Sequence, residues 1–212
     1  MKLFVTTAAA ALFSASTSYA ALLTFDGAAC NDGACGTDSE TLSQSYGDIV
    51  GEVDVVYDAN RATSDLEDLF YWGPDYETLD GVAYGVNGGG GLSIVFNALS
   101  GFSVSVTSFD IAPYANRLRD TIVQVIDLAD GTLLEDDAYA TLSTDGVTNY
   151  TGDYSSDVGI QINLGPDAWD VGIDNIAYTT APTTTTAPVP LPASVLLMLG
   201  ALGGMAALRK KS

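Results

Sequence analysis

Apolar residues recur at every second position in several short segments, and glycine, aspartate and asparagine separate these segments. Residues 102–107 and 158–164 show the pattern most clearly. A period of two places such side chains on one face of a β-strand. The other segments predicted as strands are 22–26, 53–57, 82–86, 92–97, 109–111, 121–128, 132–134, 147–154 and 168–178. The pattern predicts an all-β body, a two-sheet antiparallel β-sandwich of the jelly-roll type.

The turns between these segments can be placed from glycine and its neighbours. Residues 87–91, Asn-Gly-Gly-Gly-Gly, predict a flexible turn, and Asp130-Gly131 predicts a β-hairpin. Residues 62–70 alone suggest a helix, for which we expect one short element with Thr63 or Ser64 as N-cap.

The first twenty residues have the layout of a secretory signal peptide. Lys2 gives a positive start, residues 3–15 are apolar, and Ser18 and Ala20 place small residues three and one before a cut. The mature domain is therefore expected to begin at Ala21 and to extend to residue 178. A retained membrane helix is the weaker alternative, because the apolar stretch is short.

The other end of the chain has three parts. Residues 179–188 contain only Thr, Ala and Pro, which predicts an extended linker. An apolar run at 195–208 follows and ends at three basic residues, 209–211, which favour the cytoplasmic side. As a helix this run spans roughly 21 Å, against about 30 Å of hydrocarbon, so we expect a short transmembrane helix that anchors the protein transiently.

A short motif lies between the linker and the apolar run: Val189, Pro190, Leu191, Pro192 and Ala193. With the apolar run and the basic residues, the end from Val189 to Ser212 resembles the PEP-CTERM class of sorting signals, in its VPLPA-CTERM variant, with residues 189–193 as the sorting motif. In that class an exosortase, a membrane cysteine transpeptidase of Gram-negative bacteria, recognises the tail and delivers the protein to the cell surface or extracellular matrix. The resemblance implies export across the inner membrane, with signal peptidase and exosortase as processing partners.

The charge of the chain is strongly negative. The part between the two ends contains three basic residues, Arg61, Arg117 and Arg119, and all 27 acidic residues. Its net charge is therefore −24. Such a surface repels nucleic acid, so nucleic-acid binding is excluded. It either keeps the protein soluble or serves to bind cations. Histidine is absent, which removes His-based catalytic triads and His metal sites.

The two cysteines, Cys30 and Cys35, have four residues between them. They are too few for a structural zinc site, which needs four ligands. In an exported chain a local disulfide is the favoured interpretation. A reactive redox pair is the alternative, although such pairs are expected at a C-x-x-C spacing.

The early L-T-F-D segment and the late V-G-I-D-N-I-A-Y segment resemble the jelly-roll domains found in front of PEP-CTERM tails. Those domains are similar to galactose-binding-like carbohydrate-binding modules, in which calcium often links the first strand to the last. The resemblance implies Asp26, Asp174 and Asn175 as ligands of a structural calcium ion. The alternative is that Asp174 and Asn175 only hydrogen-bond a strand bulge. No other cofactor is expected.

Aromatic residues are densest at 70–76, and Trp169 stands near the last strand. Tyr71, Trp72 and Tyr76 are therefore candidates for sugar contact, with packing in the core or a loop as the alternative. Carboxylates are too many for a catalytic pair to stand out, and a glycosidase needs two across a cleft.

Three functions follow from these features. The first is a non-catalytic surface or matrix protein with a structural or adhesive role. The second is a carbohydrate-binding module for exopolysaccharide, stabilised by calcium. A secreted hydrolase is the least favoured. A strip of exposed aromatic rings would favour the second function, and a closed polar surface the first.

Overall fold

The computed structural model describes residues 18–31, 33–88, 90–144 and 146–183. Over these residues the protein is all-β, its strands pair antiparallel, and the one helical element is a 3-10 turn, η1 (Tyr114–Asn116). No helix within the described ranges is long and apolar enough to cross a membrane. The signal-peptide residues 1–17, the motif at 189–193 and the helix expected at 195–208 lie outside the described residues, so these expectations stay predictions.

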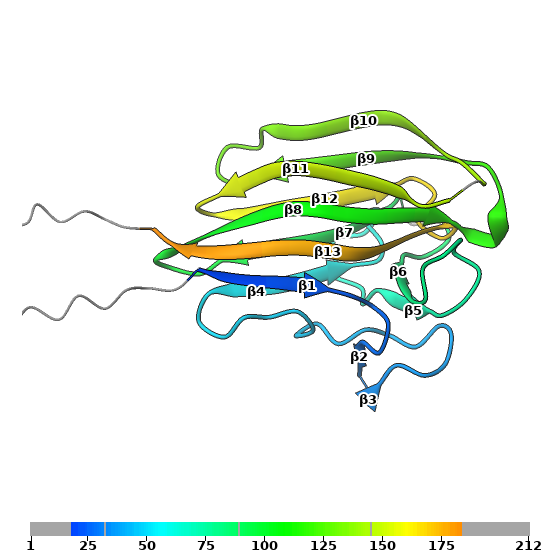
Figure 1. The fold of residues 1–212 in the computed structure, drawn as a ribbon, viewed down its shortest axis with the longest axis horizontal. Coiled ribbons are helices and arrows are strands. Elements are labelled where there is room, and N and C mark those ends of the chain that lie inside the picture. Colours follow the sequence, from blue (N-terminus) through cyan, green and yellow to red (C-terminus); the bar gives the residue numbers. More distant parts are fainter. Residues whose placement is uncertain (1–17, 32, 89, 145, 184–212) are drawn as a thin grey trace, which may run out of the picture.

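The strands form two main sheets, which lie one over the other in Figure 1. One has five strands, in the order β10 (Leu133–Leu142), β9 (Arg119–Asp127), β12 (Gly159–Gly165), β7 (Leu92–Ala98) and β4 (Val53–Asp58). The other has six, in the order β11 (Thr148–Ser156), β8 (Phe102–Pro113), β13 (Val171–Pro182), β6 (Val82–Tyr84) and β5 (Phe70–Trp72), with β1 (Tyr19–Leu23) also paired to β13. A small ribbon of β2 (Ala29–Cys30) and β3 (Gly33–Ala34) lies outside both sheets.

The core lies between the two main sheets. In β4, buried residues alternate with more exposed ones, as a strand with one face in the core requires. The inward-facing residues of β7, β8, β9, β12 and β13 join those of β4 in one hydrophobic cluster. Phe96 of β7 and Tyr178 of β13 meet across the core with ring centroids 4.9 Å apart. The β-sandwich predicted from the sequence is therefore the observed architecture.

The strand predictions hold best in the second half of the chain. From β7 onward the chain alternates between the sheets, apart from the β9–β10 hairpin, an alternation typical of jelly rolls. That hairpin turns at Asp130-Gly131, as predicted, and Gly131 takes a positive φ of 78°. Two predicted segments, 102–107 and 109–111, form the single strand β8. Strands β2, β3 and β5 were not predicted, because each has only two or three residues.

The short helix expected at 62–70 is wrong, since this segment consists of turns, bends and extended chain. The side-chain amide of Asn60 donates to Glu67 at 2.8 Å, and the main-chain N–H of Ala59 donates to the Glu67 carbonyl, also at 2.8 Å. These bonds close a loop across the segment. Asparagine side chains commonly compete with helix formation in this way.

The two ends of the described chain lie side by side. Tyr19 and Ala20 of β1 pair with Thr180 and Thr179 of β13, so pairing begins two residues before the expected mature terminus. The expected linker boundary needs a correction, because residues 179–182 continue β13. Threonine is favoured in strands. All four residues pair with β8, and Thr179 and Thr180 also pair with β1.

Candidate functional site

Five aromatic side chains form a closed circuit, here called the aromatic basket. Trp72 packs edge-on against Tyr84, with ring centroids 6.0 Å apart, and against Tyr114 at 5.4 Å. Tyr114 continues to Tyr76 at 5.3 Å, and Tyr84 continues to Trp169 at 5.5 Å. The Tyr76 hydroxyl closes the circuit by donating to the main-chain carbonyl of Trp169 at 3.3 Å. Tilted and edge-to-face pairs of this kind are favourable and fix each ring against the next.

The rings come from strand ends and loops at one end of the sandwich. Trp72 and Tyr84 are the last residues of β5 and β6, and Tyr114 directly follows β8. Main-chain hydrogen bonds join the loops: the N–H of Tyr114 donates to the Asp170 carbonyl at 2.9 Å, and the N–H of Gly85 donates to the Ala168 carbonyl at 2.8 Å. The basket therefore rests on a hydrogen-bonded backbone and not on side-chain packing alone.

The backbone around the basket takes uncommon conformations. Among the described residues, six non-glycine residues have positive φ, and four of them flank the basket: Asp75, Glu77, Ala115 and Asn116. The Ala115 N–H donates to the Asp75 carbonyl at 2.8 Å, which ties the two strained segments together. Such residues tend to gather at functional sites, where surrounding contacts hold them in place.

A glycine in β13 makes room for one wall. A Cβ at Gly172 would come within 2.8 Å of the Tyr76 ring and within 2.6 Å of Val82 Cγ2. Any larger residue would push Tyr76 away from the circuit. Tyr76 is almost fully buried, and this burial raises the pKa of its hydroxyl, so the group stays a neutral donor toward Trp169.

The five rings line a pocket of about 70 Å³. Tyr76 and Tyr84 are buried in its wall and Trp72 and Tyr114 are partly buried, whereas Trp169 is 41% exposed. Trp169 thus presents its indole to the outside while Tyr84 packs edge-on against it. An exposed indole held by a rigid frame can stack on the C–H face of a flat ligand with little loss of side-chain entropy.

Charged groups lie directly beside the exposed indole. Arg119 pairs with Asp170 at 2.9 Å and approaches Asp167 at 3.8 Å. Partial burial and the nearby Asp170 carboxylate raise the pKa of Asp167, and Arg119 opposes this shift. The loop that carries Trp169 therefore also presents two carboxylates, and Arg119 of β9 adds a guanidinium next to them. These groups can exchange hydrogen bonds with hydroxyl groups.

The basket and the chain ends lie at opposite ends of the sandwich. Val171 at the start of β13 pairs with Pro113 near the basket, while Thr180 near the strand's end pairs with Tyr19. At about 3.3 Å per residue, β13 spans roughly 36 Å between the two ends. Figure 1 shows this separation, with β5 and β6 at one end and the start of β1 at the other.

The three predicted sugar contacts divide between core and basket. Tyr71 is buried in the main core, which fits the packing alternative for this residue. Trp72 and Tyr76 both line the pocket, although only Trp72 is partly exposed. Tyr84 and Tyr114 were missed, because Tyr84 lies inside the predicted strand 82–86, Tyr114 follows β8, and no spacing relates them to Trp169.

The predicted calcium ligands Asp26, Asp174 and Asn175 lie in a second, polar pocket of about 200 Å³. Its other lining residues are Thr24, Thr78, Leu79 and Asp80. Asp174 is 4% exposed, and its Oδ1 accepts a hydrogen bond from the N–H of Phe25 at 2.8 Å. The first strand segment and the last are thus joined at Asp174, as the resemblance implied for an ion site.

The environment of Asp174 disfavours a negative charge. Burial is the main cause that raises its pKa to about 6, main-chain hydrogen bonds from Phe25 and Asn175 oppose the shift, and the carboxylates of Asp110 and Asp26 add to it. Asn175 has a φ of 52° within the β13 bulge, and its amide donates to Asp110 at 2.9 Å. These bonds agree with the hydrogen-bonding alternative, and calcium binding stays a prediction.

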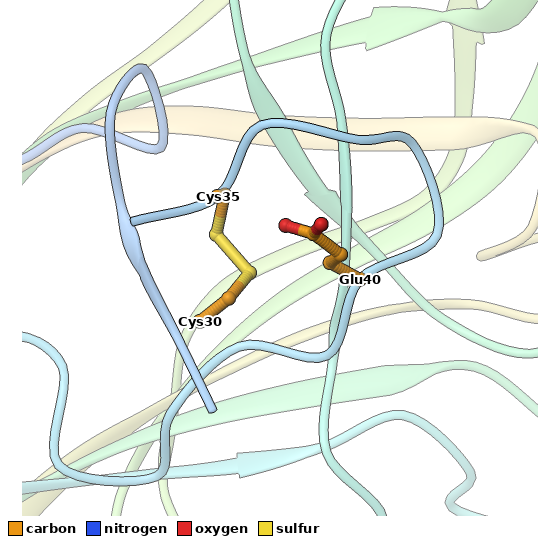
Figure 2. A group of neighbouring side chains, drawn as sticks. All are labelled: Cys30, Cys35 and Glu40. Atoms are coloured by element: carbon orange, nitrogen blue, oxygen red, sulfur yellow. A yellow bond between two sulfur atoms is a disulfide. The ribbon is translucent and has the colours of Figure 1, made fainter. Parts of the chain in front are cut away.

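Cys30 and Cys35 form a disulfide bond with an S–S length of 2.07 Å. Figure 2 shows Glu40 beside it. Within the described ranges, this is the one group of three Cys, Asp or Glu side chains whose ligand atoms lie within 4.8 Å of one another. Because both sulfurs are in the disulfide, they are not thiolates and this group is not a metal site. Glu40 instead accepts a hydrogen bond from the N–H of Gly36 at 3.0 Å.

No protein-family model matches the chain, and no curated protein matches it. Among solved structures it is similar to a Podospora anserina GH26-CBM35 β-(1,4)-mannanase, with 18% identity and a TM-score of 0.31 over 65% of this chain and 29% of the mannanase chain. It is also similar to Caldicellulosiruptor saccharolyticus CBM27-1 in complex with mannohexaose, with 10% identity and a TM-score of 0.33 over 75% of this chain and 96% of that one.

A third similar structure is the family 32 carbohydrate-binding module from C. perfringens NanJ in complex with galactose. It is 12% identical with a TM-score of 0.26, over 61% of this chain and 93% of that one. All three therefore contain carbohydrate-binding modules. At these low scores the likenesses support no conclusion about ligand or residues.

Proposed function

We propose that this protein is an exported, non-catalytic module that binds glycans at the aromatic basket, with Trp169 as the ring on which a sugar stacks. The observation that carries the proposal is the 41% exposure of Trp169 on a frame of four further aromatic rings. Tryptophan side chains are highly buried on average. This one is held rigidly at the surface, next to charged groups that can bind hydroxyls.

The surroundings of Trp169 suit a neutral or cationic glycan. Sugar rings offer C–H groups on their faces and hydroxyls at their edges, and the loop at residues 166–170 presents an indole together with Asp167 and Asp170. The net charge of −20 disfavours acidic polysaccharides and other polyanions. Adhesion to an extracellular polysaccharide would follow from such binding.

A catalytic role is not proposed. Glycosidases need two carboxylates facing each other across the scissile bond. All five residues that line the described basket are aromatic, and the nearest carboxylates of the Trp169 loop are drawn toward Arg119. The basket can hold a ligand but offers no acid and base aimed into it.

The layout of the chain supports display at a surface. The sorting tail is proposed to pass the protein to exosortase after signal peptidase has removed the N-terminal segment. Both ends of the described domain leave it opposite the basket, so an attached domain would present the basket outward. Deletion of residues 189–212 is expected to change both location and processing, and unchanged fractionation and molecular mass would contradict the sorting proposal.

Calcium is proposed as a structural ion in the polar pocket. Asp26, Asp80, Asp174 and Asn175 supply side-chain oxygens there, and calcium takes six to eight oxygen ligands. Burial raises the pKa of Asp174 to about 6, and the neighbouring carboxylates of Asp110 and Asp26 add to the shift, so a negative charge on Asp174 is disfavoured there. A bound ion would relieve this charge and fasten the first strand segment to the last.

Affinity gel electrophoresis of the full chain tests the binding function. The probes are neutral polysaccharides: hydroxyethylcellulose, galactomannan, xylan and dextran. At least one is expected to retard the wild type, and Trp169→Ala should lower the affinity roughly tenfold or more. Val50→Ala is the matched control, because Val50 is 97% exposed and lies near Glu52, whose carboxylate accepts from Thr180 at the opposite end. Equal migration with and without every polysaccharide would contradict glycan binding and favour a structural role.

A further inference from the structure

A second exposed aromatic ring lies at the same end of the sandwich as the basket. Tyr139 of β10 is 87% exposed. It stands where the β9–β10 register shifts between Asp137 and Ala140, so it belongs to a β-bulge. Bulges re-aim side chains away from the regular pleat, and this one turns a large ring outward. The ring of Tyr139 therefore does not contribute to the packing of the core.

The ring of Tyr139 borders a shallow, mostly apolar groove of about 260 Å³. Its other lining residues are Asp120, Thr121, Ile122, Ala138 and Pro166. Ile122 is 36% exposed, and Asp120 and Pro166 are exposed as well. Like the proposed site at Trp169, this groove offers one exposed aromatic ring and a nearby carboxylate.

The groove and the basket share one loop. Pro166 lines the groove, and Trp169 lines the basket three residues later. Three residues of extended chain reach at most about 10 Å, so the two sites are neighbours. Arg119 pairs with Asp167 and Asp170 of the same loop, and Asp120 of the groove follows Arg119 in β9. Charged hydrogen-bonding groups therefore lie on and beside the loop that the two sites share.

We propose that the Tyr139 groove is a second sugar subsite, continuous with the Trp169 site, and that the ligand is a polysaccharide bound along several consecutive units. This inference rests on the proposed glycan-binding function and specifies its ligand class. Trp169 stacks on one sugar, the Arg119 ion pairs bind hydroxyls between the sites, and Tyr139 stacks on a sugar further along the same chain. The acidic surface restricts that chain to neutral or cationic sugars.

Calorimetric titration with ligands of different length tests the second subsite. The probes are the disaccharide and the longer oligosaccharides made by partial hydrolysis of whichever polysaccharide retards the full chain. Tyr139→Ala should weaken binding of the longer oligosaccharides roughly two- to tenfold and leave the disaccharide unchanged. Tyr139→Phe keeps the ring face and should restore binding. Trp169→Ala should weaken binding of both ligands, and Val50→Ala should weaken neither.

The outcomes separate this inference from the function on which it rests. If Trp169→Ala abolishes binding while Tyr139→Ala matches the wild type at every length, the second subsite is wrong and the glycan-binding function stands. If no polysaccharide in the set binds the wild type, both fail together. If Tyr139→Ala weakens the disaccharide and the longer chains equally, the groove is part of a single short site and the extended ligand is wrong.

Discussion

The hydroxyl of Tyr76 donates to the main-chain carbonyl of Trp169 at 3.3 Å, across 93 residues of sequence. This bond joins the loop after β5 to the loop before β13 and closes the aromatic basket. Tyr76→Phe keeps the ring and removes the donor. It should lower the free energy of unfolding by about 1 kcal/mol and increase acrylamide quenching of Trp169. Unchanged quenching together with unchanged stability would show that the bond does not hold the loop.

Gly172→Ala should disturb the basket more strongly than the loss of that hydrogen bond. The added methyl would lie within 2.8 Å of the Tyr76 ring, and overpacking of this kind costs about 1–3 kcal/mol. Urea denaturation measures the loss. Gly36→Ala is the matched control, because its Cβ would meet nothing within 4 Å and its φ is not in the left-handed region. Similar stability of the two variants would contradict the packing described around Tyr76.

The stability of the protein should depend on pH through Asp174. Its pKa is raised to about 6 in the folded state from an unfolded value of 3.8, so the folded state binds the proton more tightly. This contribution is fully present below about pH 4 and is lost as the pH rises through 6. Over that window it amounts to about 3 kcal/mol at the usual conversion.

Asp174→Asn removes this dependence and keeps an oxygen to accept from Phe25. In the presence of a chelator, the variant should be the more stable protein above about pH 7, and the difference should fall toward zero near pH 4. Denaturant midpoints measured across that range provide the comparison. Asp153→Asn, at an exposed carboxylate of β11, is the control and should follow the wild type. If the wild type has the higher denaturant midpoint above pH 7 with chelator present, burial does not disfavour the charge of Asp174, and the description of this site is contradicted.

Calcium should reverse the sign of that difference. Added calcium is expected to raise the thermal midpoint of the wild type near neutral pH, because an ion that binds only the folded state stabilises it. The rise should be absent in Asp174→Asn and reduced in Asp26→Asn. Magnesium, which prefers smaller octahedral sites, should have a weaker effect. Equal midpoints with calcium and with chelator would leave Asp174 and Asn175 with their hydrogen-bonding role alone.

The sandwich could be predicted because the sequence of each strand indicates its structure locally. Apolar residues alternate with polar ones in residues 102–107 and 158–164, which indicates that one face of each strand is buried, and Asp130-Gly131 indicates a tight turn. Alternation does not show where a strand stops, however. Residues 179–182 continue β13 because β1 and β8 pair with them, and composition alone suggested a linker. Residues 62–70 were expected to form a short helix. Hydrogen bonds from Ala59 and Asn60 to Glu67 hold them in a loop instead.

The basket could be predicted only in part. Trp72 and Tyr76 were candidates because aromatic residues are dense around them, and that density also drew in Tyr71, which is buried in the core. Tyr84, Tyr114 and Trp169 come from three separate segments, and tertiary packing alone brings them together. The exposure of Tyr139 could not be predicted, because it results from a bulge that depends on the register between β9 and β10.

The central claim is that a glycan contacts Trp169, and the fluorescence of this residue tests it most directly. The chain has two tryptophans, so Trp72→Phe leaves Trp169 as the one indole. With the polysaccharide that retards the full chain, we expect the emission of Trp169 to shift to shorter wavelength and its quenching by acrylamide to fall. Retardation by the polysaccharide with an unchanged Trp169 spectrum would place the glycan elsewhere and contradict the proposed site.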